Sequence, residues 1–146
     1  MSALRSAVVG LKGMGQQHLK ALAENPRADL VAVCDLDRDS AREAAAAYGA
    51  RAHIDYRDLL ASADLDAIVF ATPHHLHAPM ALDALQAGVH TFVEKPIANR
   101  VSDADRMVAL AESMGLVLAV GHNYRTFPVN VRLKELSLIH ISEPTR

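Results

Sequence analysis

Short, almost uninterrupted apolar runs are separated along the chain by longer amphipathic stretches. Most of these runs are rich in β-branched residues, which is typical of parallel strands buried on both faces. The runs cover residues 7–9, 30–34, 67–70, 91–93 and 116–120, and we expect a shorter strand near 52–54. The pattern therefore predicts several short strands of one parallel sheet.

Between the runs, apolar residues recur with the period of a helix. Ala78, Ala81, Leu82 and Leu85 follow the i, i+3, i+4, i+7 pattern and predict a helix that stops at Gly88. Four further helices are expected. The first follows residue 15 and stops at 25–26, the second covers 40–48, and a short third one begins at 55. The fourth has Ser102 as its N-cap and stops at Gly115. Alternating strands and helices predict an α/β fold with a doubly wound, mostly parallel sheet of the Rossmann type.

Composition and charge narrow the classes of partner. Of the 146 residues, 51% are apolar and 22% charged, as in an ordinary globular domain with a core. The net charge of −2 does not favour a nucleic-acid partner. The single cysteine, Cys34, excludes an internal disulfide and fits a reducing compartment. No apolar stretch reaches signal-peptide or membrane-spanning length, so we expect no membrane partner and a cytoplasmic location.

A glycine-rich turn follows the first expected strand. It reads Gly10-Leu11-Lys12-Gly13-Met14-Gly15. A dinucleotide pyrophosphate is bound by free backbone N–H groups and a helix N-terminus, usually in a G-x-G-x-x-G turn. Here Gly10 and Gly15 take the first and third positions, and Lys12 replaces the second glycine. We expect Gly13 to restore room for the phosphates and Lys12 to add charge to the site.

An acid stands where a dinucleotide site needs one. Asp35 lies 20 residues beyond Gly15, at the end of the second expected strand, where a carboxylate accepts hydrogen bonds from the ribose hydroxyls. It also repels a 2′-phosphate, which favours NAD over NADP, although Arg38 close by would weaken that preference. The alternative interpretation is an ordinary tight turn followed by a surface aspartate. A short-chain dehydrogenase is excluded, because none of the three tyrosines is followed four residues later by lysine.

Three later segments carry a family resemblance. They are Ala71-Thr72-Pro73-His74-His75-Leu76-His77, Glu94-Lys95-Pro96 and Gly121-His122-Asn123-Tyr124-Arg125. Together with the glycine turn extended to His18, they resemble the glucose–fructose oxidoreductase / inositol dehydrogenase / MocA family. The resemblance implies an NAD(P)-binding Rossmann domain, a second α/β domain, and hydride transfer to or from a sugar, cyclitol or related hydroxy compound.

The resemblance also implies roles for single residues. Thr72 and Pro73 would line the cofactor, and His77 would begin the next helix near the dinucleotide. Glu94 and Lys95 would end a strand beside the nicotinamide, with Lys95 as the catalytic residue and the Lys95–Pro96 bond cis. A lysine there stabilises the alkoxide that develops as hydride leaves carbon.

The remaining histidines and the cysteine have simpler interpretations. His74, His75 and His77 cluster at a helix start, but no carboxylate or cysteine joins them at metal-ligand spacing, so we expect no metal site. For His18 and Cys34 we expect packing roles.

The resemblance divides the chain into three parts. We expect an NAD(P)-binding domain over 1–121, the start of a truncated substrate domain over 122–136, and a foreign tail over 137–146 that does not resemble the family. The family's second α/β domain, which supplies a further catalytic Asp or His, is expected to be missing, and the full-length parent is expected to form a homo-oligomer. Two alternative interpretations of the sequence are a dinucleotide-sensing regulator on the same scaffold and a complete small NAD-binding module.

Overall fold

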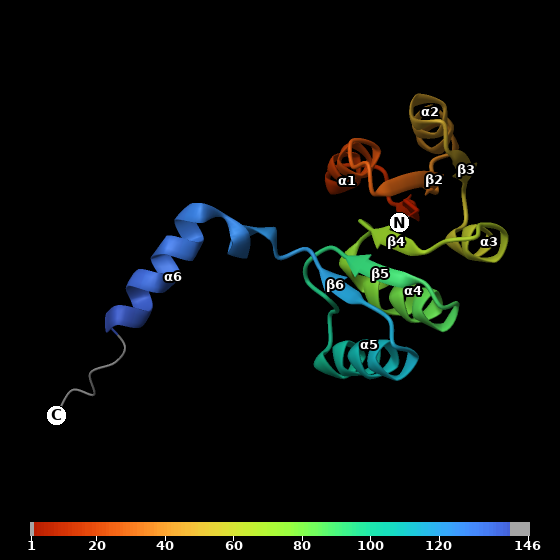
Figure 1. The fold of residues 1–146 in the computed structure, drawn as a ribbon. Coiled ribbons are helices and arrows are strands. Elements are labelled where there is room, and N and C mark those ends of the chain that lie inside the picture. Colours follow the sequence, from red (N-terminus) through yellow and green to blue (C-terminus); the bar gives the residue numbers. More distant parts are fainter. Residues whose placement is uncertain (1, 141–146) are drawn as a thin grey trace.

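Six strands form one parallel sheet in the order β3-β2-β1-β4-β5-β6 (Figure 1). The computed structural model describes residues 2–140, and the side chains of residues 2–136. The strands are β1 Leu4–Val9, β2 Ala28–Cys34, β3 Arg51–His53, β4 Ala67–Phe70, β5 His90–Val93 and β6 Leu118–Val120. The helices are α1 Met14–Ala23, α2 Arg38–Tyr48, α3 Tyr56–Ser62, α4 His74–Gln86, α5 Val101–Met114 and α6 Pro128–His140, with a 3₁₀ turn η1 Asn123–Thr126. The predicted doubly wound Rossmann sheet is confirmed.

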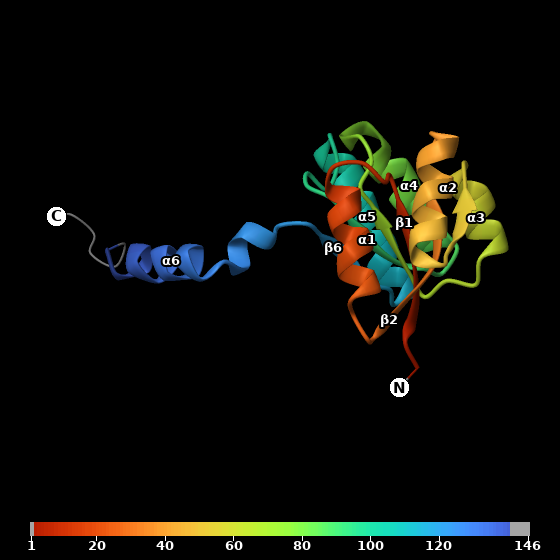
Figure 2. The same ribbon diagram turned by 90° about the horizontal axis from the view of Figure 1, so that it is seen from above.

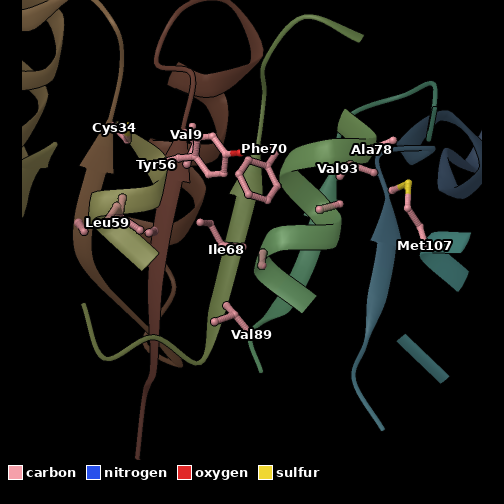
Figure 3. Close-up of a cluster of buried hydrophobic side chains, with 14 residues drawn as sticks. Val9, Cys34, Tyr56, Leu59, Ile68, Phe70, Ala78, Val89, Val93 and Met107 are labelled. Atoms are coloured by element: carbon pink, nitrogen blue, oxygen red, sulfur yellow. The ribbon is translucent and has the colours of Figure 1, made fainter. Parts of the chain in front are cut away.

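Helices cover both faces of the sheet, with α1 and α2 on one side and α4 and α5 on the other (Figure 1). On the α3–α5 side the core includes Leu59, Phe70 and Met107, all fully buried, and the Tyr56 ring meets the Phe70 ring edge-on at 6.2 Å (Figure 3). On the other side Leu19 and Ala41 pack on β1 and β2. Burial on both faces explains why the strands read as apolar runs rather than as alternating patterns.

Capping residues explain some of the helix ends. Asp37 caps α2 by accepting hydrogen bonds from the N–H groups of Asp39 and Ser40, and α5 ends at Gly115 in the left-handed conformation, as predicted. The prediction of Ser102 as the N-cap of α5 is wrong. The N-cap is Arg100, because the helix begins at Val101 in exposed chain, where solvent can satisfy the first N–H groups without a capping side chain.

Polar contacts join two segments at the edge of the sheet where the strands begin, here called the amino edge. The backbone N–H of Arg5 donates to Asp66 Oδ2 at 2.7 Å, and the Arg5 guanidinium pairs with both Asp64 and Asp66. These aspartates lie in the connection from α3 to β4. The contacts therefore fix that connection against the start of β1, at the edge opposite the glycine turn.

Beyond β6 the chain leaves the sheet. Helix α6 stands away from the other elements in both views (Figures 1 and 2), and its apolar side chains at 129, 131, 133 and 136 are exposed. Residues 137–140 of the expected foreign tail continue α6, and 141–146 lie outside the described residues. Among the described helices, none is long and apolar enough to cross a bilayer.

Candidate functional site: a dinucleotide cavity and a lysine loop

The carboxyl ends of β1, β2, β4 and β5 meet at one edge of the sheet. The strand order reverses direction around β1, since β2 lies on one side of it and β4 on the other. Connections that diverge to opposite faces leave a crevice at this point, where open α/β sheets bind their ligands. All the residues considered below lie at or beside this edge.

Two glycines make the turn after β1 sterically feasible. A Cβ on Gly10, which has φ +85°, would lie 2.5 Å from the Ala71 carbonyl oxygen, and a Cβ on Gly15 would lie 1.8 Å from the Gly10 carbonyl oxygen. Neither contact is possible for a real side chain. Glycine at both positions therefore lets the N-terminus of α1 pack closely against the end of β1, and a helix N-terminus is a place where an anion can bind.

The middle of the turn is open to a ligand. A Cβ on Gly13, which has φ +55°, would meet nothing within 4 Å, so the space beside it is free. Lys12 does not reach over this space. Its Nζ lies 2.9 Å from Asp37 Oδ2, and the ammonium, together with hydrogen bonds from Ser40, lowers the pKa of that carboxyl to about 2. Of the two expectations for this turn, room at Gly13 fits the structure, whereas the charge of Lys12 is paired with Asp37. Met14 is the first residue of α1 and is exposed.

Asp35 is held rigidly at the end of β2. Its Oδ2 accepts the N–H of Leu11 at 2.9 Å, and its Oδ1 accepts the N–H of Asp37 at 2.9 Å. Each carboxylate oxygen can accept a second hydrogen bond. The geometry thus ties the glycine turn to β2 and still leaves acceptor positions for a pair of ligand hydroxyls.

A cavity of about 500 Å³ opens beside Asp35. Its charged lining residues are Lys12, Asp35, Asp55 and Arg57. The remaining walls are largely apolar and include Leu36, Ile54, Thr72, Pro73, Leu76 and Met80. An apolar slot next to a fixed carboxylate matches a flat heterocycle attached to a ribose. Arg38 does not line this cavity but a neighbouring one of about 290 Å³. Thr72 and Pro73 line the cavity, as expected. Leu36, Ile54 and Met80 were missed in the sequence, because they come from separate parts of the chain and share no motif.

Cys34 also borders this cavity from the end of β2. The thiol is buried, and burial raises its pKa to about 12. A thiol that is protonated at neutral pH is a poor nucleophile. This fits the packing role expected of Cys34.

The second part of the site is the loop after β5, which carries Lys95. The Lys95–Pro96 peptide bond is cis, as predicted. Lys95 is exposed at this edge, whereas Glu94 is buried. Glu94 Oε1 lies 2.8 Å from His18 Nε2, and Glu94 Oε2 accepts the Lys95 N–H at 3.2 Å. The lysine is thus free to meet a ligand, while the glutamate before it is fixed.

His77 lies beneath the site rather than in it. The side chain is fully buried in the first turns of α4 and does not line the cavity. Its Nδ1 lies 2.7 Å from the Pro96 carbonyl oxygen and its Nε2 2.9 Å from the Thr72 carbonyl oxygen. It therefore connects the loop after β4 with the lysine loop. Among the described residues, no three His, Cys, Asp or Glu side chains could hold a metal ion together.

A family model described as an oxidoreductase family with an NAD-binding Rossmann fold, that of the glucose–fructose oxidoreductase / inositol dehydrogenase / MocA proteins, matches residues 4–122. The chain belongs to this family. The match covers every strand of the sheet and ends just after β6, so the NAD-binding domain predicted from the glycine turn is confirmed.

Similar proteins agree with this family assignment. The chain is 34% identical over 126 residues to 4-carboxy-2-hydroxymuconate-6-semialdehyde dehydrogenase of Sphingobium sp., covering 86% of this chain and 40% of that protein. The structure of GenD2 from gentamicin A biosynthesis, in complex with NAD, has a TM-score of 0.88 at 36% identity, over 94% of this chain and 39% of that one. The WlbA dehydrogenase of Chromobacterium violaceum, in complex with NADH and UDP-GlcNAcA, has a TM-score of 0.89 at 32% identity, over 95% and 41%. The chain thus spans about two fifths of the length of these relatives.

His18 was underestimated from the sequence. It is the last residue of the extended glycine-turn motif, and packing alone was expected of it. The structure places its ring edge-on against Phe92 with 5.1 Å between centroids, and also within hydrogen-bond distance of Glu94. The available signal was its position one helical turn beyond Gly15, on the side of α1 that faces the sheet.

Proposed function

We propose that this chain is the cofactor-holding part of an NAD(P)-dependent oxidoreductase that transfers hydride between a nicotinamide and a sugar, cyclitol or related hydroxy compound. The observation that carries the proposal is the Asp35 carboxylate, fixed by two backbone N–H groups at the mouth of a largely apolar cavity beside the glycine turn. The printed names of relatives, which include inositol 2-dehydrogenase and UDP-N-acetylglucosamine 3-dehydrogenase, support this class of substrate.

The residues fit a dinucleotide in a definite order. The apolar slot with Leu36 and Ile54 takes the adenine, Asp35 the adenosine ribose hydroxyls, and the N–H groups at the start of α1 the pyrophosphate. Thr72 and Pro73, beyond the end of β4, then lie between the glycine turn and the lysine loop. The strand order supports this arrangement, since β4 lies between β1 and β5.

Lys95 is proposed as the catalytic residue of this domain. When bound, the nicotinamide supplies an acceptor for the hydride that leaves the substrate carbon. As the C–H bond breaks, the oxygen on that carbon becomes a carbonyl oxygen and releases its proton. The exposed Lys95 side chain is proposed to hydrogen-bond this oxygen and accept the proton, and to return it in the reverse direction. The choice of substrate is proposed to depend on the part of the relatives' length that lies outside the match.

NAD is proposed as the preferred cofactor, with NADP as the alternative. A carboxylate with two acceptor oxygens suits free ribose hydroxyls and repels a 2′-phosphate. Arg38 lines a different cavity. The two cations that border this cavity each have an acidic partner, Asp37 for Lys12 and Asp83 for Arg57, which favours NAD over NADP. The buried Cys34 fits a reducing, cytoplasmic location, which stays a prediction.

Fluorescence titration of the chain with NADH and NADPH tests this proposal directly. We expect saturable binding of NADH with one site per chain, competition by NAD, and weaker binding of NADPH. If neither nucleotide shows saturable binding, the proposal is wrong. Tighter binding of NADPH than of NADH would refute the role given to Asp35. A dinucleotide-sensing regulator would also bind NADH, but no relative named above supports that alternative.

A further inference from the structure

Lys95 stands between two residues that are each held by a histidine from a different helix. Glu94 before it is bound through its carboxylate by His18 of α1, and Pro96 after it is bound through its carbonyl oxygen by His77 of α4. These helices lie on opposite faces of the sheet (Figure 1). The Lys95 side chain takes part in none of the ion pairs among the described residues.

The contact on the α1 side is closely built. The side chains of His18 and Glu94 are 19% and 10% exposed, so the 2.8 Å contact is shielded from water. A Cβ at Gly121, the residue after β6, would lie 2.9 Å from Glu94 Oε1 and 3.0 Å from Oε2. The absence of a side chain there makes room for the carboxylate, and Phe92 supports the histidine ring from the edge. The position of the Glu94 carboxylate therefore depends on α1 through His18, on β5 through Phe92, which supports that histidine, and on the residue after β6.

The contact on the α4 side uses both nitrogens of a fully buried ring. Both neighbours are carbonyl oxygens, which only accept hydrogen bonds, so every ring nitrogen that carries a proton donates to one of the two loops. His53 offers a contrast, because its buried Nε2 has no hydrogen-bond partner among the described residues. Burial of a histidine in this chain therefore does not by itself give each ring nitrogen a polar neighbour, whereas both nitrogens of His77 have one.

We propose that His18 and His77 are positioning residues that together fix the Glu94-Lys95-Pro96 segment and so present Lys95 to the bound cofactor. Helix α1 begins at the glycine turn, and α4 begins directly after Thr72 and Pro73. Both histidines are therefore carried by elements that contact the dinucleotide in the proposed function, on which this inference rests. On this proposal, a displacement of the start of α1 or of α4 on cofactor binding would shift the segment that carries Lys95.

Amide hydrogen exchange measured by NMR on the whole chain tests the inference without relying on cofactor. His18→Phe keeps a ring against Phe92 but removes the bond to Glu94, whereas His18→Gln retains a donor near the position of Nε2. We expect the Lys95 amide to exchange roughly tenfold faster in His18→Phe than in the wild type. We expect His18→Gln to restore most of the protection, and the amides of Val8 and Val33 to change in neither variant.

A second pair of variants examines the other face. His77→Asn retains a donor near the position of Nδ1, which serves Pro96, whereas His77→Gln retains one near Nε2, which serves Thr72. We expect faster exchange at Lys95 in His77→Gln than in His77→Asn. If both His77 variants fail to fold, the His18 pair alone decides. Equal exchange at Lys95 in His18→Phe and His18→Gln, or equal acceleration at Val8, Val33 and Lys95, would overturn the inference.

Affinity for NADH provides the readout that a purely structural role would not move. We expect His18→Phe to weaken NADH binding roughly tenfold and His18→Gln to bind as the wild type does. If the wild-type chain does not bind NADH, the proposed function fails, while the exchange result still shows whether the histidines hold the segment. If exchange responds as expected but NADH affinity is the same in all variants, the histidines fix the segment without coupling it to the cofactor, and the positioning role is refuted.

Discussion

The backbone N–H of Leu11 donates to Asp35 Oδ2 over 2.9 Å, so the carboxylate that is proposed to bind the ribose also fixes the glycine turn. The proposed recognition of the ribose and the shape of the glycine turn therefore depend on one side chain. A change at Asp35 is expected to alter the fold and the cofactor preference together, which separates this residue from an ordinary surface aspartate.

Asp35→Asn tests that double role. The amide NH₂ would face one of two backbone N–H groups, so the free energy of unfolding is expected to fall by about 1–3 kcal/mol. NADH affinity is expected to fall tenfold or more and NADPH affinity to fall less. Denaturant unfolding and nucleotide titrations measure both effects. Asp39→Asn, at an exposed position in the first turn of α2, is the matched control, and an unchanged NADH to NADPH ratio in Asp35→Asn would contradict the assignment.

Gly15→Ala is expected to be among the most damaging single-methyl changes in the chain. The new Cβ would overlap the Gly10 carbonyl oxygen at 1.8 Å, and separating α1 from β1 is expected to cost about 3 kcal/mol. Gly49→Ala is the control. A Cβ there meets nothing within 4 Å and only the positive φ of +68° is unfavourable, at about 1 kcal/mol. Thermal and urea unfolding compare the two, and similar losses would argue against the close approach.

The Lys12–Asp37 pair predicts a specific dependence of stability on pH. Hydrogen bonds from Lys12, the largest cause, and from the hydroxyl and N–H of Ser40 together lower the pKa of Asp37 from 3.8 to about 2. The unfolded state therefore binds a proton more readily than the folded state between these values. The stabilising contribution is therefore complete above about pH 4 and is lost as the pH falls towards 2. Lys12→Met is expected to reduce this acid-dependent loss.

Melting temperatures between pH 2 and 6 measure this effect. Lys20→Met serves as the control, because Lys20 is about as exposed as Lys12 and its ion pair, with Glu24, is longer, at 3.8 Å. The interpretation fails if Lys12→Met and the wild type lose stability in parallel over this range.

Cys34 is expected to resist alkylation in the folded chain. Burial raises the pKa of its thiol to about 12, so at pH 8 hardly any thiolate forms and the sulfur is shielded. Iodoacetamide labelling followed by mass spectrometry is expected to be at least tenfold slower than in urea-unfolded chain. Because Cys34 borders the cavity, saturating NADH is expected to slow the labelling of Cys34 further. Labelling of the folded chain at the unfolded rate would contradict this burial.

The sequence predicted the sheet well and the side-chain contacts of the site less well. Buried parallel strands leave a local signature in β-branched runs, and Asp35 is found by its distance from the glycines, so both are readable without a structure. The partner of Lys12 is not, because whether an exposed lysine reaches a phosphate or Asp37 depends on where α2 begins in space. His18 was misjudged for the same reason, since Glu94 is 76 residues away in sequence and only the strand order makes them neighbours.

The position of the Arg5 contacts with Asp64 and Asp66 has a practical consequence. They close the edge of the sheet opposite the glycine turn, and the connections that enter β2, β5 and β6 lie along that same edge. Extra residues, a reporter group or a surface anchor inserted into those connections would stay a full strand length away from the proposed dinucleotide site. Insertions are therefore best placed in the connections that enter β2, β5 and β6, away from both the candidate site and the Arg5 contacts.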